Sequence, residues 1–218
     1  MNKYHLFFRT LALLTLVMLI YAKMPDISNY EMDSDPYIFA SKINYNEVKT
    51  ELFNSEVNAI IEIPAGTIGK WEVDKSDGKL KWEFKKGKPR KVKYLGYPAN
   101  YGMIPGTLLS KEKGGDGDPL DVIILGPAIE RGKVLRVKII GVMYLLDGGE
   151  KDDKLIAVIK DSHFSQINDI SELNNNFTGI LDIIELWFTN YKGPGELKSE
   201  GFGNKDKAMS VIKSAIVK

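Results

Sequence analysis

The sequence predicts a mainly β fold of the α+β class, in which short antiparallel strands form a small barrel and helices flank it. Three observations support this prediction. Short runs rich in β-branched residues, such as residues 57–63 and 155–159, have the length and composition of strands. Asp77-Gly78 separates two alternating runs in the manner of a hairpin turn. Apolar residues recur at helical spacing in the C-terminal part.

Length and composition narrow the range of functions. The 218 residues suffice for one domain with a hydrophobic core. The 30 basic and 29 acidic residues nearly balance, which argues against a nucleic-acid partner, because such proteins carry a strong basic excess. The absence of cysteine excludes disulfides, thiolate catalysis and zinc–thiolate sites. His5 and His163 are far apart, and no serine motif accompanies His163.

Residues 1–23 differ from the rest of the chain. Lys3 and Arg9 precede an apolar run over residues 11–20, which predicts a signal peptide and export, periplasmic or secreted. An uncleaved membrane anchor is the second interpretation, although a span needs about 20 apolar residues, and a buried core helix is the third. Loss of this leader would change the net charge from +1 to −2, because it contains three basic residues and no acid.

The remaining chain divides into an arm and a domain. Residues 24–55 are polar and mixed, and they predict an extended N-terminal arm with one helical turn near residues 46–53. Residues 56–218 contain the periodic segments and form the predicted domain. All motifs that suggest chemistry lie in this domain.

The first predicted strands carry charged residues. In residues 57–63, Glu62 interrupts an apolar run, so it either points outward or faces a polar cavity. Residues 70–74 alternate strictly, which places Lys70 and Glu72 on one face of a strand. Taken alone, this second strand is an ordinary half-exposed strand.

Residues 97–102 read Tyr-Pro-Ala-Asn-Tyr-Gly and predict a loop, because proline and glycine interrupt regular structure. Tyr97 and Tyr101 offer an apolar ring and a hydroxyl donor. They form either a packed aromatic corner or a pair of ligand-binding hydroxyls.

The stretch Gly115–Asp121 places three carboxylates close together, at the start of the apolar strand predicted over residues 122–125. Carboxylates packed this closely repel one another unless cations neutralise them, and magnesium prefers such oxygen ligands. A solvated acidic turn is the alternative. An EF-hand calcium loop is excluded, because its sixth and twelfth positions would be Asp121 and Pro127 instead of glycine and glutamate.

A second acidic loop, residues 147–154, connects the strands predicted over residues 134–144 and 155–159. A solvated hairpin loop is one interpretation. The other is that both acidic loops lie at strand ends and meet around a shared metal cluster.

Two helices are predicted near the C-terminus. Apolar residues recur at 3, 4, 7, 8 and 11 steps from Ile180 to Tyr191, and Gly193-Pro194-Gly195 ends that helix. A second apolar stripe runs over residues 208–216. Residues 165–176 are polar and end in three asparagines that predict a break.

Taken in order, these motifs resemble those of the soluble family I inorganic pyrophosphatases. The shared motifs are I-E-I-P at 61–64, K-x-E at 70–72, an arginine at 90, Y-P-x-N-Y-G at 97–102 and D-x-D-P-x-D at 116–121. The family pattern D-E-x-E-x-D-x-K is matched by Asp147, Asp152 and Lys154, whereas Gly148 replaces an acid. The resemblance covers about residues 55–215 and implies an OB-like five-stranded barrel flanked by two helices, which hydrolyses inorganic pyrophosphate to two phosphates.

The resemblance also implies a role for each matched residue. Several magnesium ions, or manganese or another divalent cation in their place, are bound by Asp116, Asp121, Asp147 and Asp152, with Asp121 bridging two of them. The attacking water is positioned or deprotonated by Asp118, and Lys154 assists. The phosphates are held by Lys70, Arg90, Tyr101, Tyr191 and Lys192. These groups are oriented by an outer shell of Glu62, Glu72 and Tyr97.

The family further implies a homo-oligomer, a hexamer in bacteria and a dimer in eukaryotes, and a cytoplasmic location if residues 1–23 are not a signal. The expected partner is the small molecule pyrophosphate, with no nucleic acid and with membrane contact only through an uncleaved leader.

Three other functions compete with this one. A binding module on an OB-like barrel would grip nucleic acid or an anionic glycan, and it would need a basic face with exposed aromatic residues. An exported metal-binding structural protein would bind calcium without releasing phosphate. A metal phosphohydrolase for larger esters would prefer nucleotides or monoesters to pyrophosphate.

Overall fold

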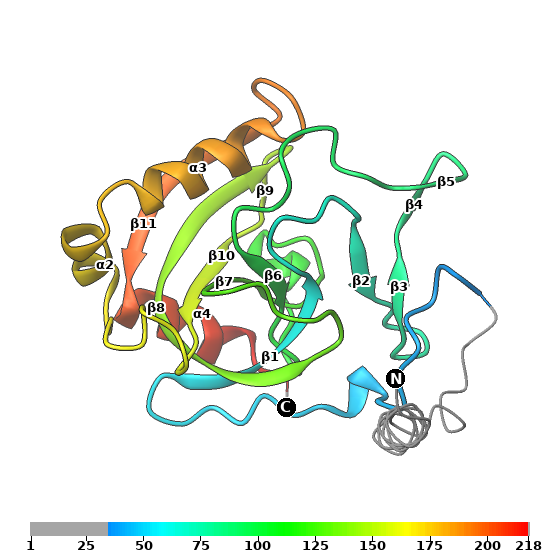
Figure 1. Ribbon diagram of the computed structural model, residues 1–218, viewed down its shortest axis with the longest axis horizontal. Helices are drawn as coiled ribbons and strands as arrows, with labels where there is room; N and C mark the ends of the chain where they lie inside the picture. The colour runs from blue at the N-terminus through cyan, green and yellow to red at the C-terminus, as the bar shows by residue number, and fades with distance from the viewer. Residues whose placement is uncertain (1–34, 218) are drawn as a thin grey trace, which may run out of the picture. The chain divides into compact units, whose positions relative to one another are not determined.

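Five strands of the computed structural model close into a mixed β-barrel (Figure 1). In the order in which they pair, they are β1 (Glu56–Ile63), β6 (Asn100–Met103), β7 (Asp121–Leu125), β10 (Lys154–Val158) and β8 (Val134–Asp147). Strand β8 also pairs with β1, which closes the barrel, and β7 and β10 are parallel whereas the other pairs are antiparallel. The predicted fold, mainly β with a five-stranded OB-like barrel, is confirmed.

The structure describes residues 35–217, apart from the side chain of Lys113. The predicted leader, residues 1–23, and the first part of the predicted arm therefore lie outside the described residues. Within 35–217, no helix combines the length and the apolar character that crossing a membrane requires.

Smaller elements surround the barrel. Two hairpins consist of β2 (Trp71–Val73) with β3 (Leu80–Trp82), and β4 (Phe84–Lys85) with β5 (Lys88–Pro89). Strand β8 also pairs with β9 (Glu150–Lys151) and β11 (Leu197–Asn204). The helical segments are η2 (Tyr45–Glu47), η3 (Lys111–Lys113), α2 (Ile170–Asn176), α3 (Ile180–Asn190) and α4 (Lys205–Ala215).

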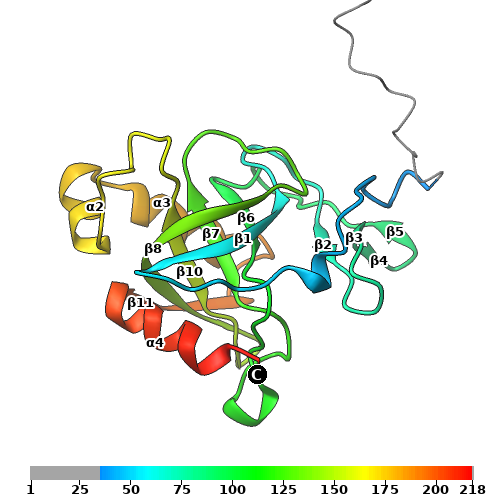
Figure 2. The same cartoon turned by 90° about the horizontal axis from the view of Figure 1, so that it is seen from below.

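Alternate residues of the barrel strands face two hydrophobic clusters. Ile123 of β7 belongs to the cluster that packs against α2 and α3, whereas Val122 belongs to the cluster that packs against α4. The two views show α3 along one side of the sheet and α4 along another (Figures 1 and 2). Strands covered on both faces need apolar residues at consecutive positions, which explains the apolar run that follows Asp121.

Three local predictions need correction. Residues 97–102 were expected to be a loop, but Asn100–Met103 is strand β6, which pairs with both β1 and β7. The helical turn expected near residues 46–53 is a 3-10 turn at Tyr45–Glu47. The polar residues 165–176 include helix α2, which begins after the N-cap Asp169 and ends at Asn176.

The side chain of Asn100 explains why this short strand is stable. It is completely buried, and its Oδ1 accepts hydrogen bonds from the backbone N–H groups of Ala65, at 3.1 Å, and Ile129, at 2.8 Å. Its Nδ2 donates to the carbonyl oxygen of Pro127 at 2.9 Å. Asn100 thus satisfies buried backbone groups of the segments that follow β1 and β7, which compensates for the shortness of β6.

Candidate active site

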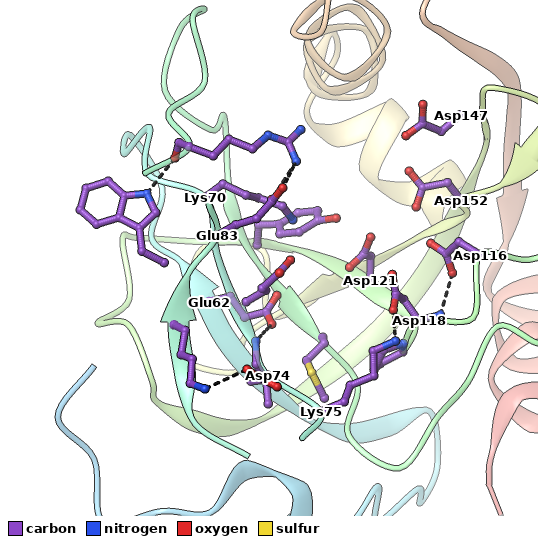
Figure 3. Close-up of a pocket in the computed structure, with 18 of the residues that line it drawn as sticks. Glu62, Lys70, Asp74, Lys75, Glu83, Asp116, Asp118, Asp121, Asp147 and Asp152 are labelled. Atoms are coloured by element: carbon purple, nitrogen blue, oxygen red, sulfur yellow. Dashed lines mark hydrogen bonds and ion pairs between the residues drawn. The ribbon is translucent and has the colours of Figure 1, made fainter. Parts of the chain in front are cut away.

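One pocket of about 820 Å³ gathers nearly all the predicted site residues (Figure 3). The predicted residues that line it are Glu62, Lys70, Glu72, Arg90, Tyr101, Asp116, Asp118, Asp121, Asp147, Asp152, Lys154, Tyr191 and Lys192. Tyr97 is not among the lining residues, because it is buried behind Tyr101 with their ring centroids 5.3 Å apart. Figure 3 shows the five aspartates along one side of the pocket and Lys70 on the other.

Strand pairing brings the two acidic loops together. In the parallel pair β7–β10, Asp121 is the register partner of Lys154, so the first acidic loop enters β7 beside the end of the second loop. The loops also bond directly, since the backbone N–H of Lys151 donates to the carbonyl oxygen of Gly114 at 2.8 Å. Residues more than thirty positions apart along the chain therefore face one cavity.

Backbone hydrogen bonds fix the shape of the first acidic loop. The N–H of Asp118 donates to Oδ1 of Asp116 at 2.8 Å, and the N–H of Gly117 donates to the carbonyl oxygen of Leu109 at 2.8 Å. Gly117 has φ +85°, a left-handed conformation that favours glycine. The two aspartates that flank Gly117 are consequently held in a defined turn.

Lys154 lies at the centre of the acidic side. Its Nζ forms an ion pair with Asp121 at 2.5 Å and another with Asp152, although only 4% of the Lys154 side chain is exposed. Burial raises the pKa of Asp121, but Lys154, Lys70 and a hydrogen bond from Tyr101 lower it more, so the net pKa lies below its usual value. Burial and the neighbouring Asp121 outweigh Lys154 at Asp152 and raise its pKa to about 6.

Two further aspartates are also paired with lysines. Lys192 pairs with Asp147, and Lys75 pairs with Asp118. Among the described residues, no three acidic or histidine side chains already form a group that could hold a metal ion. The pocket therefore balances its acids with ammonium groups.

The oxygen donors nevertheless suit hard divalent cations. Asp116, Asp121, Asp147 and Asp152 line the same cavity. Burial and nearby carboxylates raise the pKa of Asp116 as well as that of Asp152. A divalent cation stabilises the ionised form of carboxylates that are crowded together and buried. These four residues therefore fit such an ion.

The opposite side of the pocket is cationic and phenolic. Burial lowers the pKa of Lys70, but Tyr97, Asp121 and Glu62 raise it more, so Lys70 remains an ammonium group at neutral pH. Its Nζ lies 5.2 Å from the ring centroid of Tyr101. Tyr191 stacks on Trp187 with their ring centroids 4.7 Å apart, which holds it at the end of α3 beside Lys192.

Ten residues that line the pocket were not predicted as site residues, and two of them, Lys75 and Glu83, form ion pairs with predicted ones. Glu83 holds Arg90, whose Nη1 donates to both carboxylate oxygens at 2.7 and 2.8 Å. Lys75 donates to the carbonyl oxygen of Gly117 at 2.9 Å and so connects the β2–β3 turn to the acidic loop. Neither belongs to a recognisable motif, and only the pairing of distant segments reveals them.

Gly148, which replaces an acid, lies in the turn between β8 and β9. It has φ +60° and its neighbour Gly149 has φ +94°, as a two-residue hairpin turn requires. A Cβ atom added at Gly148 would meet no atom within 4 Å. The glycine therefore serves the turn and fills no part of the pocket.

Glu62 has an unusual environment for a carboxylate. It is 4% exposed, and its Oε1 accepts a hydrogen bond from the N–H of Val73 at 2.8 Å. Burial raises its pKa from 4.5 to about 8, against the opposing effect of Lys70. The sequence allowed either an outward orientation or a polar cavity, and the structure shows the cavity.

We expect Glu62→Gln to change the pH dependence of stability. Between pH 4.5 and about 8 the folded protein keeps a proton on Glu62 that the unfolded chain has lost, so its stabilising contribution declines as pH rises. The expected slope is about 1.4 kcal/mol of unfolding free energy per pH unit. In urea denaturation at several pH values, the unfolding free energy of Glu62→Gln should increase relative to that of the wild type as pH increases.

The control is Glu196→Gln, because Glu196 is exposed. Its unfolding free energy should run parallel to that of the wild type across the same pH range. Parallel curves for Glu62→Gln as well would contradict the raised pKa.

The chain is similar to a family of known proteins. Residues 59–218 match the family model described as inorganic pyrophosphatase. An inorganic pyrophosphatase of Sulfolobus acidocaldarius is 35% identical over 166 residues, which cover 73% of this chain and 89% of that protein. An inorganic pyrophosphatase of Mus musculus is 36% identical over 176 residues, which cover 71% of this chain.

Solved structures show the same similarity. An inorganic pyrophosphatase from Helicobacter pylori superposes with a TM-score of 0.67 at 32% identity, covering 78% of this chain and 96% of that chain. One from Schistosoma japonicum has a TM-score of 0.71 at 31% identity, covering 76% of this chain and 66% of that chain. The matched regions span 61% of the length of the mouse relative and 63% of that of the mitochondrial relative from Saccharomyces cerevisiae.

Proposed function

The chain belongs to the inorganic pyrophosphatase family, and from this premise we propose that its pocket hydrolyses inorganic pyrophosphate to two phosphates. The observation that carries the proposal is that Asp116, Asp118, Asp121, Asp147 and Asp152 lie opposite Lys70 in one cavity. Arg90, Tyr101 and Tyr191 line the same cavity. A tetra-anionic substrate needs cationic groups around it, and a metal site needs carboxylates. This pocket supplies both.

Magnesium is the cofactor that we propose, with manganese or another divalent cation as a substitute. Asp116, Asp121, Asp147 and Asp152 would hold several ions, and Asp121 would be shared between two of them. When bound, the ions would neutralise the substrate and lower the pKa of a water molecule. Lys154 pairs with Asp121 and Asp152, and Lys192 pairs with Asp147, so cation binding at these carboxylates would free both ammonium groups.

The phosphate-binding role falls to the cationic and phenolic residues of the pocket. Lys70, Arg90, Tyr101, Tyr191 and Lys192 would orient the two phosphates. Glu83 positions Arg90 through its two carboxylate contacts, and Trp187 supports Tyr191 by stacking. Glu62, Glu72 and Tyr97 would orient these groups from behind.

Asp118 is the proposed acceptor for the proton of the attacking water. Its side chain is 55% exposed and lines the pocket at the acidic loop, so a water molecule can reach it. The bond from its N–H to Asp116 holds its backbone in the turn, and its carboxylate contacts Lys75. Lys154 would assist by stabilising charge on the neighbouring groups.

Phosphate release tests this function. We expect the protein to release phosphate from pyrophosphate in the presence of magnesium, and to lose this activity with a chelator and regain it with added magnesium. Nucleoside triphosphates and phosphate monoesters should be much poorer substrates. Phosphate release that is indifferent to the chelator, or that favours monoesters, would contradict the proposal. Calcium binding without any phosphate release would support the structural-protein alternative.

Residues 1–23 are proposed to direct the chain to export or to a membrane, supported by Lys3 and Arg9 ahead of the apolar run. N-terminal sequencing of the mature protein tests cleavage. We also propose a homo-oligomer on the basis of the family, and light scattering would measure its mass.

A further inference from the structure

The β4–β5 hairpin and the segment after it are strongly basic. From Lys85 to Lys93, six of nine residues are basic and none is acidic. The remainder of the chain has 24 basic and 29 acidic residues, so positive charge is concentrated here. Residues 84–95 are called the basic hairpin surface below.

The exposed lysines of this surface have no acidic partner in the part of the chain that the structure describes. Arg90 turns inward to Glu83. The exposed residues are Lys85, Lys86, Lys88, Lys91 and Lys93. Within residues 35–217, none of these five forms an ion pair. Their charge is therefore not neutralised by an acidic side chain of the described part of the protein, and only Lys91 has a ring contact there, with its Nζ 5.5 Å from the ring centroid of Trp82.

The hairpin geometry places like charges directly opposite one another. Lys85 pairs with Lys88 across the two strands, and the turn consists of Lys86 and Gly87, at φ +54° and +71°. Like charges in opposed positions destabilise a hairpin. Figure 1 shows this hairpin projecting from the body of the protein. A cluster that costs stability and points outward indicates an anionic partner.

Exposed apolar side chains belong to the same segment as the lysines. Leu95 is 73% exposed, Phe84 48% and Tyr94 42%. The position of Leu95 is fixed, because its carbonyl oxygen accepts a hydrogen bond from Nε1 of Trp187 at 3.0 Å. A segment that combines an exposed aliphatic residue with several exposed lysines is typical of surfaces that enter the headgroup region of a bilayer.

The aromatic rings do not favour a nucleic acid. Single-stranded nucleic acids stack their bases on the faces of aromatic side chains. Tyr94 packs edge-on against Trp187, and Phe84 packs edge-on against Tyr37. Trp82 lies between Trp71 and the ammonium group of Lys91. These rings are already engaged by neighbouring side chains.

We propose that the basic hairpin surface docks on an anionic phospholipid membrane, with its lysines at the headgroups and Leu95 in the apolar layer. Each lysine near such a surface strengthens binding roughly fivefold. The five exposed lysines do not line the pocket, whereas Phe84 and Arg90 of the same segment do, so the proposed docking and the proposed hydrolysis use different side chains of this segment.

Vesicle co-sedimentation of the full chain tests the proposal. Binding is measured to phosphatidylcholine vesicles and to vesicles that also contain phosphatidylglycerol. The result is expressed as the ratio of the two affinities, because the leader is present in every variant and the ratio isolates the effect of the anionic lipid. Changing Lys85, Lys86 and Lys88 to Gln should lower this ratio by about a hundredfold. The matched control changes Lys198, Lys207 and Lys213, also exposed, to Gln and removes the same charge. It should lower the ratio less than about threefold.

A second variant, Leu95→Gln, distinguishes a membrane partner from a nucleic-acid partner. It should weaken vesicle binding most at high salt, where the charge attraction is screened. Equal losses in the hairpin and control variants would overturn the proposal, and so would a ratio that the hairpin variant leaves unchanged. The surface would be assigned to nucleic acid instead if the protein bound a single-stranded oligonucleotide more tightly than anionic vesicles. That binding would have to be lost in the lysine variant and unchanged in Leu95→Gln.

Discussion

Asp118→Asn is expected to fold normally and to lose turnover by roughly 10²–10⁴-fold, the range for removal of a general base. The amide keeps the shape of the carboxylate but cannot accept the proton of the attacking water. Folding should be preserved, because Asp118 is 55% exposed and its side chain pairs only with the half-exposed Lys75 among the described residues. Exposed pairs of this kind contribute about 0–1 kcal/mol.

The measurement is phosphate release at saturating pyrophosphate, together with a thermal melt. The matched control is Asp77→Asn, which removes the same charge from the β2–β3 turn and does not line the pocket. It should retain turnover within about threefold. Turnover of Asp118→Asn close to that of the wild type would show that another group accepts the proton.

Asp121→Asn is expected to abolish both activity and stabilisation by magnesium. Asp121 accepts contacts from Lys154 and Tyr101, and it is the carboxylate proposed to be shared between ions. Loss of one partner of a buried ion pair costs roughly 3–5 kcal/mol. We expect a smaller loss of about 2 kcal/mol, because the side chain of Asp121 is 24% exposed and Asp152 still pairs with Lys154.

The decisive readout is the melting temperature as magnesium is added. A ligand that binds only the folded state raises it in proportion to the logarithm of its concentration at high occupancy. The wild type and the control Asp161→Asn, an exposed aspartate, should show this rise. Asp121→Asn should not. An unchanged magnesium response in Asp121→Asn would exclude Asp121 as a ligand, whatever its effect on turnover.

The sequence predicts most of the barrel because its strands are apolar and bounded by turn residues. Residues 57–63, 122–125 and 155–159 illustrate this, since each coincides with β1, β7 or β10 within a residue or two. Strand β6 was missed because Pro98 and Gly102 resemble loop residues, and because its stability comes from the side chain of Asn100, which bonds to distant segments. Such long-range compensation leaves no local pattern.

The composition of the candidate site was predictable for a different reason. Its acids and tyrosines occur in short motifs with fixed spacing, and the structure brings them to one cavity. Glu83 and Lys75 act only through contacts between separate segments, so their positions could not be predicted from spacing. The roles of all these residues stay predictions until the variants are measured.

The parallel pairing of β7 with β10 determines where the chain tolerates insertions. A slip of one residue in either strand would exchange the two faces, so Asp121 or Lys154 would point away from its partner. One extra residue at Gly148-Gly149 would only lengthen a turn that is surrounded by open space. An insertion scan should therefore find activity sensitive to single-residue additions inside either strand and tolerant of additions at the diglycine turn.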